Sequence, residues 1–184
     1  MLVLLAGVAA ISCAAVLVRL ALAPPVLVAA GRLLIASAVL LPLCLMSSRR
    51  EFLQLFRARW RYVLLAGTLL AAHFALWIAS LSCTTVASSV VLVTTTPLIV
   101  AMASYIFFGE RLRRMTFVGM GVCFVGAVLI GYAGWRQGGT APSGNALAFG
   151  GALAMAGYLL VGRRLRRDTS LLPYSTAAFS VAGV

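Results

Sequence analysis

The chain has 184 residues, of which 63% are apolar and only 10% are charged, and its formal net charge is +12. With a mean hydropathy of +1.09 it has too few polar side chains to cover a water-soluble globule, so that class is excluded. The positive charge does not favour nucleic-acid binding, because the basic residues are spread over short loops instead of one face of a folded domain.

Seven apolar stretches follow one another along the chain. About 20 helical residues cross the roughly 30 Å of hydrocarbon in a bilayer. Backbone groups in hydrocarbon must be hydrogen-bonded within their own segment, and the stretches lack a two-residue alternation, so we expect helices. The expected spans are 2–18, 25–46, 62–82, 86–108, 115–133 and 145–162, followed by a shorter one at 171–184. The sequence therefore predicts an all-α, polytopic transmembrane helix bundle with about six to seven spans.

All of the basic residues are arginines, and most of them lie in alternate loops between the expected spans. These loops follow the second, fourth and sixth spans. Short arginine-rich loops stay on the cytoplasmic side of a membrane, so we expect the N-terminus to be cytoplasmic. The three acidic residues, Glu51, Glu110 and Asp168, lie in the same loops.

In the second span, Arg32 lies about seven residues from the outer end. An ionisable side chain in a membrane is costly unless it faces protein or water. Two interpretations stay open, because the guanidinium could reach the lipid headgroups or contact a substrate.

The third span carries His73, Trp77 and Ser80 at positions i, i+4 and i+7, which places them on one face of a helix. We expect His73 and Trp77 to contact substrate in a water-accessible cavity near the middle of the bundle. The alternative is a buried histidine that only hydrogen-bonds within the protein.

In the fourth span, Ser88, Thr95 and Met102 share a face, and Ser88 and Thr95 are further candidate substrate contacts. Pro97 has no N–H to donate to the carbonyl of Val93, so the helix is expected to kink there. The kink is either a fixed packing feature or a hinge.

Side chains around this proline and at the end of the span have expected partners. The neighbouring threonine hydroxyls, 94–96, are expected to bond the freed carbonyls. Gly109 fits a left-handed C-terminal cap, and Glu110 is expected to pair with Arg113 or Arg114.

The fifth and sixth spans contain small residues and one further candidate. Gly119, Cys123, Ala127 and Gly131 recur every four residues, which predicts a ridge for close helix packing. In the sixth span, Tyr158 is another candidate substrate contact, with the same alternative of a purely structural role.

Residues 4–20 and 147–165 are similar to each other. A shift of 144 residues places Gly7 on Gly151 and Arg19 on Arg163, and a proline follows each copy. Five spans separate the two starts, and this odd number places the second copy in the membrane upside down. Inverted repeats of this kind are typical of transporters, whose substrate site lies near the midplane between the halves.

Three segments resemble the EamA repeat of the drug/metabolite transporter superfamily: "PPVLVAAGRLLIASAVLLPL", "TTVASSVVLVTTTPLIVAMASYIFFGERL" and "GMGVCFVGAVLIGY". The most specific part is Pro97 followed by Gly109-Glu110-Arg111. The resemblance implies a first five-helix repeat at 1–134 and the incomplete start of a second, inverted repeat at 145–184, out of ten expected spans. It also implies a multi-pass protein of the cell inner (plasma) membrane.

By the same resemblance, the expected function is a permease that exports or exchanges small metabolites such as amino acids or drugs by alternating access. The absence of carboxylates from the expected spans favours a neutral, zwitterionic or anionic substrate. The other expected partner is the lipid bilayer, and homo-oligomerisation is left open. Because the chain ends inside the seventh expected span, the alternative is a truncated membrane fragment or packing subunit that does not transport.

Cofactor and enzyme chemistry is not expected. The four cysteines occur singly, with no neighbouring ligands for a metal. One histidine, no acid within a span and no glycine-rich phosphate loop leave no general acid–base pair.

Overall fold

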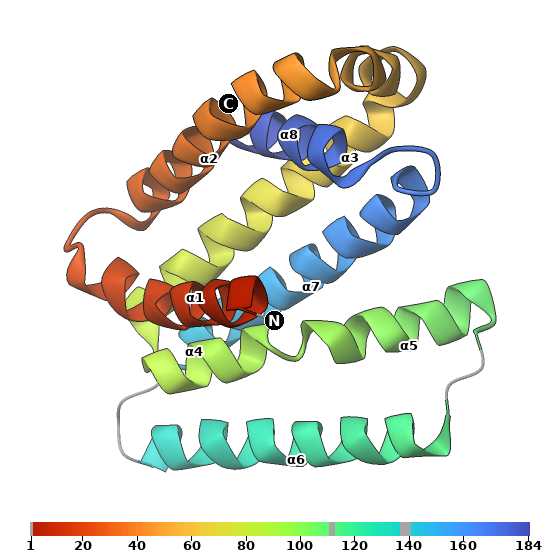
Figure 1. Ribbon diagram of the computed structural model, residues 1–184. Helices are drawn as coiled ribbons and strands as arrows, with labels where there is room; N and C mark the ends of the chain where they lie inside the picture. Colours follow the sequence, from red (N-terminus) through yellow and green to blue (C-terminus); the bar gives the residue numbers. More distant parts are fainter. Residues whose placement is uncertain (1, 111–112, 137–140) are drawn as a thin grey trace.

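The computed structural model describes residues 2–110, 113–136 and 141–184, and within these residues the chain forms eight helices and no strand. The helices are α1 (Leu2–Leu20), α2 (Pro25–Ser47), α3 (Arg49–Cys83), α4 (Val86–Val93), α5 (Thr96–Phe108), α6 (Arg114–Arg136), α7 (Pro142–Leu165) and α8 (Leu171–Ala182) (Figure 1).

Within the described part of the chain, five segments are long and apolar enough to cross a membrane: α2, α3, α4 together with α5, α6 up to Gly134, and α7. The 19-residue α1 is also strongly apolar, and α8 is a shorter apolar helix of 12 residues. Large apolar side chains are exposed on many of these helices, as expected where lipid is the solvent. The predicted all-α polytopic bundle is confirmed.

Helix α3 lies at the centre of the bundle, with α7 running beside it (Figure 1). Small residues allow this close packing, because a Cβ on Gly144 would lie 2.7 Å from the carbonyl carbon of Cys83. Ala148 and Ala152 on the same face of α7 are fully buried. Helix α8 packs against α3 and α2, and α4 and α5 pack against α7. Helices α7 and α8, the last two in the sequence, are therefore part of the core.

The arginine-rich segment before the third span is helical, which corrects the predicted loop. Helix α3 begins at Arg49 instead of residue 62 and continues through a local break in helical geometry at Arg59 (φ −137°, ψ 29°). Leu55 is buried in the core and Phe52 packs beside it. The segment forms an amphipathic turn of helix because its apolar side chains can reach the bundle while its arginines remain outside.

The fourth span is interrupted, as Pro97 predicts. Helix α4 ends at Val93, α5 begins at Thr96, and Pro97 lies in the first turn of α5, where a missing N–H is tolerated. The threonine hydroxyls donate to carbonyls three residues earlier: Thr94 to Val91 (2.9 Å), Thr95 to Leu92 (2.6 Å) and Thr96 to Val93 (2.7 Å). The expected compensation of the freed carbonyls is confirmed.

The left-handed cap is also confirmed, since Gly109 has φ 64° at the end of α5.

The predicted packing ridge on α6 is wrong for the part that the structure describes. Cys123 is exposed, and a Cβ on Gly119 would meet no atom within 4 Å. Among Gly119, Cys123 and Ala127, whose burial the structure describes, Ala127 alone is buried, because α6 lies at the edge of the bundle beside α4 (Figure 1). The burial of Gly131 lies outside what the structure describes.

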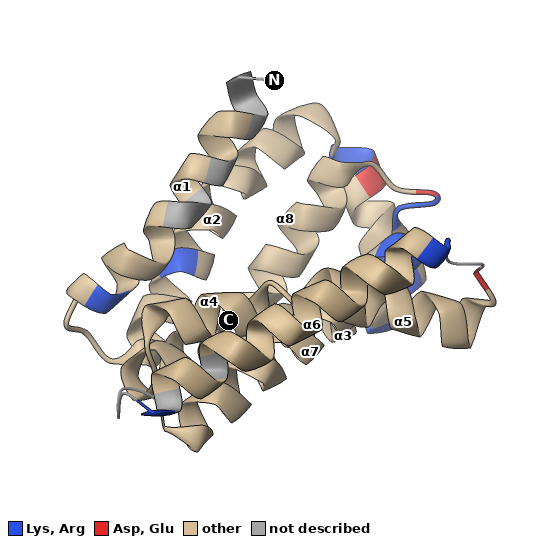
Figure 2. Ribbon diagram, turned by 90° about the horizontal axis from the view of Figure 1, so that it is seen from below, with Lys and Arg blue, Asp and Glu red and all other residues tan. Residues whose placement is uncertain are grey.

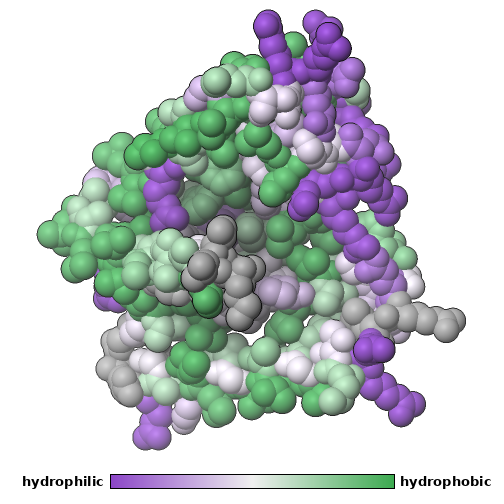
Figure 3. All heavy atoms as spheres, viewed as in Figure 1, coloured by the Kyte–Doolittle hydropathy of each residue, from purple (hydrophilic) through white to green (hydrophobic). Residues whose placement is uncertain are grey.

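Charged residues gather at one end of the bundle. Figure 2 shows most of the charged ribbon around the start of α3, the end of α5 and the turn from α7 to α8. In Figure 3 hydrophilic atoms follow the corresponding edge, and the rest of this face is mainly hydrophobic. A long apolar body with one strongly basic end suits a protein that is embedded in a bilayer.

Candidate functional site

A cavity of about 350 Å³ lies between α1, α2, α3, α4 and α7. Its lining is mostly apolar, with a few polar groups, as in typical small-molecule sites. The lining residues are Ala14, Ala15, Arg32, His73, Phe74, Trp77, Val90, Val93, Thr94 and Met155. Three of the predicted substrate contacts, Arg32, His73 and Trp77, are therefore brought together.

His73 connects the central helices at this cavity. Its side chain is buried, and Nδ1 lies 2.9 Å from the carbonyl oxygen of Gly151 on α7. A carbonyl only accepts hydrogen bonds, so Nδ1 carries the proton and donates, which leaves Nε2 as an acceptor in the neutral ring. The ring stacks on Trp77, one helical turn later, with centroids 6.1 Å apart and planes inclined by 9°. This stack fixes both rings.

Arg32 reaches inward from α2 over two aromatic rings. Its guanidinium carbon lies 5.4 Å from the ring centroid of Phe74 and 5.6 Å from that of Trp77. Cation–π contacts at this distance stabilise a charge that is partly removed from water. The guanidinium therefore lies at the wall of the cavity.

Trp77 has an unused hydrogen-bond donor. The side chain is only 8% exposed, and its Nε1–H is buried without a hydrogen-bond partner among the described residues. A buried, unpaired donor costs about 1–3 kcal/mol, so few are retained in folded proteins. A hydrogen-bond acceptor that reached this N–H would remove this cost.

Ser88 and Thr95 lie outside this cavity. The Ser88 hydroxyl donates to Oδ1 of Asn145 (2.9 Å), which also accepts from Thr84 (2.9 Å), so these contacts join α7 to α4 and the end of α3. Thr95 lines a second, almost wholly apolar cavity of about 330 Å³ beside α6, and its hydroxyl is used in the bond to Leu92. A substrate role for these two residues stays a prediction.

Tyr158 also lies elsewhere, in the core between α7 and α8. Its ring stacks on Tyr174 with centroids 5.6 Å apart, and the Tyr174 hydroxyl donates to the Tyr158 carbonyl (3.3 Å). Both rings are buried in the main apolar cluster. The position suits the structural alternative, and a substrate role for Tyr158 stays a prediction.

Sequence reasoning missed Phe74, Thr94 and Met155 as lining residues. It selected polar side chains that shared a helix face, and Phe74 and Met155 carry no polar atom that would mark them. In the sequence, Phe74 could be marked as a lining residue only by its position next to His73. Met155 follows Gly151 by one turn of α7, so its role required the packing of α7 on α3.

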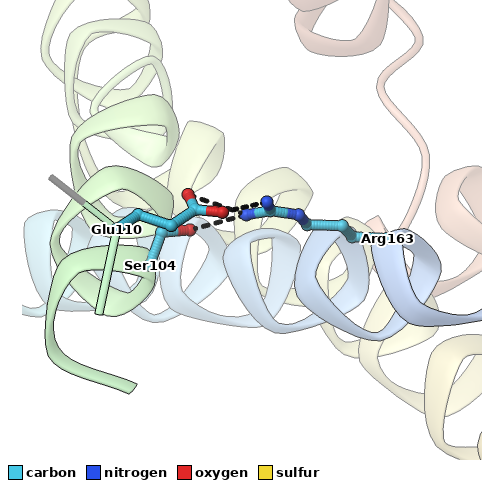
Figure 4. A network of polar contacts seen from close by, with 3 residues as sticks. All are labelled: Ser104, Glu110 and Arg163. Atoms are coloured by element: carbon cyan, nitrogen blue, oxygen red, sulfur yellow. Dashed lines mark hydrogen bonds and ion pairs between the residues drawn. The ribbon is translucent and has the colours of Figure 1, made fainter. Parts of the chain in front are cut away.

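A second polar group joins α5 to α7 at the basic end of the bundle. Arg163 on α7 donates to both carboxylate oxygens of Glu110, one of them at 3.0 Å, and also to the hydroxyl of Ser104 (3.2 Å). Figure 4 shows the guanidinium pointing across to both residues. This corrects the predicted partners of Glu110, which were Arg113 and Arg114. The nearest cation comes from α7 because α5 and α7 pack side by side.

A polytopic helix bundle with a cavity lined by arginine and aromatic side chains between its helices has the features of a membrane transporter. The family model described as the EamA-like transporter family matches residues 1–132, and the chain belongs to this family. It is accordingly a multi-pass membrane protein of a transporter family, not of an enzyme family. Searches of curated proteins and of solved structures found no match.

Proposed function

We propose that the protein is a permease of the inner membrane that exports or exchanges small neutral, zwitterionic or anionic metabolites by alternating access. The observation that carries the proposal is a cavity that brings Arg32 and His73 together with Trp77, whose buried Nε1–H has no hydrogen-bond partner among the described residues. Donors kept without protein partners in a membrane protein favour a ligand site over a purely structural interior.

In this proposal Arg32, His73 and Trp77 contact the substrate. Helix α7 supplies Met155 to the lining and the carbonyl that holds His73. In the proposed repeat organisation, α7 opens the second repeat, so the site lies between the repeats. Movement of one repeat against the other would then expose the cavity to each side in turn.

The test is flux through the purified protein in proteoliposomes, measured by counterflow for a panel of radiolabelled amino acids and small organic acids. We expect Trp77→Ala to lower flux at least tenfold at near-normal membrane abundance. Trp60→Ala is the matched control, since Trp60 is exposed on the same helix and lies outside the cavity. Absence of flux for the whole panel, or equal flux in both variants, would contradict the proposal.

A further inference from the structure

None of the acidic side chains in the given sequence pairs with Arg32. The sequence holds only three acidic side chains, and all three are engaged at the basic end: Glu51 with Ser170, Glu110 with Arg163, and Asp168 with Arg59. An arginine within a membrane span is costly unless it meets water, an acceptor or an anion. The two aromatic rings beneath Arg32 compensate its charge only in part.

We propose that the cavity binds small organic carboxylates that have an apolar body, with Arg32 as the counter-charge. This inference rests on the proposed function and narrows its substrate class. A carboxylate is acceptor-only, and its two oxygens match the guanidinium fork of Arg32 at the wall of the cavity.

The charge of the cavity selects a monoanion. Among the described lining residues Arg32 is the one arginine, and a neutral His73 ring suffices to donate the Nδ1–H to Gly151. A cationic ligand would meet the charge of Arg32 without any acid to offset it. A phosphate dianion would bring twice the negative charge that one guanidinium balances.

The remaining lining selects an apolar body. Apart from the polar groups, the walls consist of alanine, valine, Phe74 and Met155. A volume of about 350 Å³ lies at the lower end of the range for small-molecule sites. Aromatic or branched aliphatic acids of low mass combine the required charge, size and surface.

The test compares carboxylates with their uncharged amides on the purified protein in nanodiscs. The probes are phenylacetate, indole-3-acetate and 4-methylpentanoate, each paired with its carboxamide, and binding is measured by calorimetry. We expect at least one acid to bind about tenfold or more tightly than its amide, because a hydrogen-bonded charge is lost in the amide. If no acid binds more tightly than its amide, the proposal is overturned, and Arg32 is left to contact lipid phosphates.

Variants assign the preference to Arg32. Arg32→Gln is expected to bind acid and amide equally, and Arg32→Lys to retain part of the preference. Arg19→Gln is the matched control, because Arg19 lies at the exposed end of α1. An unchanged preference in a folded Arg32→Gln protein would overturn the assignment. If Arg32→Gln does not fold, Arg32→Lys and the acid–amide pairs on the unmodified protein still decide.

Binding and flux separate this inference from the proposed function. Carboxylate binding without flux in proteoliposomes would contradict the permease and leave the carboxylate site standing. Flux of amides or amines without any carboxylate preference would contradict the carboxylate site and leave the permease standing.

Discussion

Trp77 performs two tasks that a mutation can separate. Its ring stacks on His73 and supports Arg32, whereas its indole N–H contacts no acceptor in the described protein. The ring therefore contributes to packing, whereas the buried, unpaired N–H lowers the stability of the protein.

We expect Trp77→Phe to leave the free energy of unfolding within about 1 kcal/mol of the unmodified protein, because removal of the unpaired donor offsets the loss of buried apolar area. Flux should fall several-fold, since the donor to the ligand is missing. Trp77→Ala should lose about 3 kcal/mol through the cavity that it creates. Chemical denaturation in detergent, paired with flux per molecule, measures both quantities. Normal flux in Trp77→Phe would leave the N–H without a role.

The interrupted fourth span shows which helix features the sequence could predict. Pro97 and the threonines before it fixed the break between α4 and α5, and Gly109 fixed the cap, because these effects act within a few residues of the chain. The extension of α3 back to Arg49 was missed, since arginines mark a loop only when no apolar face reaches the core. The sequence therefore predicted where helices break and end better than it predicted which residues pack against other helices.

Pairing between helices was largely beyond the sequence. The bond from His73 to Gly151, the role of Met155 and the partner of Glu110 all depend on α7 packing beside α3 and α5. Helical spacing identifies the face that carries His73 and Trp77, but it does not show which helix lies opposite that face. For the same reason, the spacing of small residues on α6 predicted packing at Gly119 and Cys123, which are exposed.

Pro97 can be tested as a hinge. Its ring is exposed, so none of the described helices is shaped around it, and its removal should restore a helical bond near Val93. We expect Pro97→Ala to keep or raise the melting temperature in detergent, by up to roughly 2–4 °C, and to slow flux per molecule several-fold. A variant that is less stable yet transports normally per molecule would identify Pro97 as a packing element.

The α3–α7 contact can be tested at Gly144. An added Cβ would lie 2.7 Å from the backbone of Cys83, which cannot move aside as a flexible side chain could. Gly144→Ala should therefore cost about 1–3 kcal/mol, measured as a lower melting temperature. Gly119→Ala on α6 is the control, because its Cβ would meet no atom within 4 Å. Equal melting temperatures would place the two helices farther apart.

Across the whole molecule, the acidic side chains join helices that are distant in sequence. Glu51 accepts hydrogen bonds from the backbone and hydroxyl of Ser170, and Asp168 pairs with Arg59 at 2.6 Å. Together with Glu110, they connect α3 and α5 to the α7–α8 segment at the basic end (Figure 2). Opening the cavity toward this end would require some of these contacts to separate.

The Glu110–Arg163 ion pair predicts a pH dependence. Hydrogen bonds donated by Arg163 lower the pKa of Glu110 below its ordinary value of 4.5, and the charges of Arg163 and Arg167 act in the same direction. Because the pKa of Glu110 is lowered, the ion pair stabilises the contact between α5 and α7 above pH 4.5. This stabilisation is lost as the pH falls through the lowered pKa. Spin labels at Ile106 and Leu159 should therefore keep their separation from pH 7 to 5 and move apart only below 4.5.

Two variants control this measurement. Glu110→Gln should show the wider separation already at pH 7, because a neutral amide cannot replace the ion pair. Glu51→Gln should leave the separation unchanged, since Glu51 connects α3 to Ser170 and not α5 to α7. If the distance between the labels does not change with pH in the unmodified protein and is no wider in Glu110→Gln, this ion pair does not hold α5 and α7 together.

Membrane orientation follows from the position of the arginines, and we expect the basic end to face the cytoplasm. Single cysteines replacing Arg57, Arg113 or Arg166, in a protein without the four native cysteines, should resist a membrane-impermeant maleimide added to intact cells. A cysteine at Ala23, in the exposed turn between α1 and α2, should react. The reverse labelling pattern would invert the topology.

The bond between His73 and Gly151 spans 78 residues of sequence, and the bond between Ser88 and Asn145 spans 57. At a synthesis rate of about 5–20 residues per second, α7 leaves the ribosome roughly 3–16 s after the groups that it will satisfy. During that interval His73 and Ser88 are inserted without their final partners. We therefore expect the polar groups of α3 and α4 to need protection from lipid, by water or by the insertion machinery, until α7 arrives.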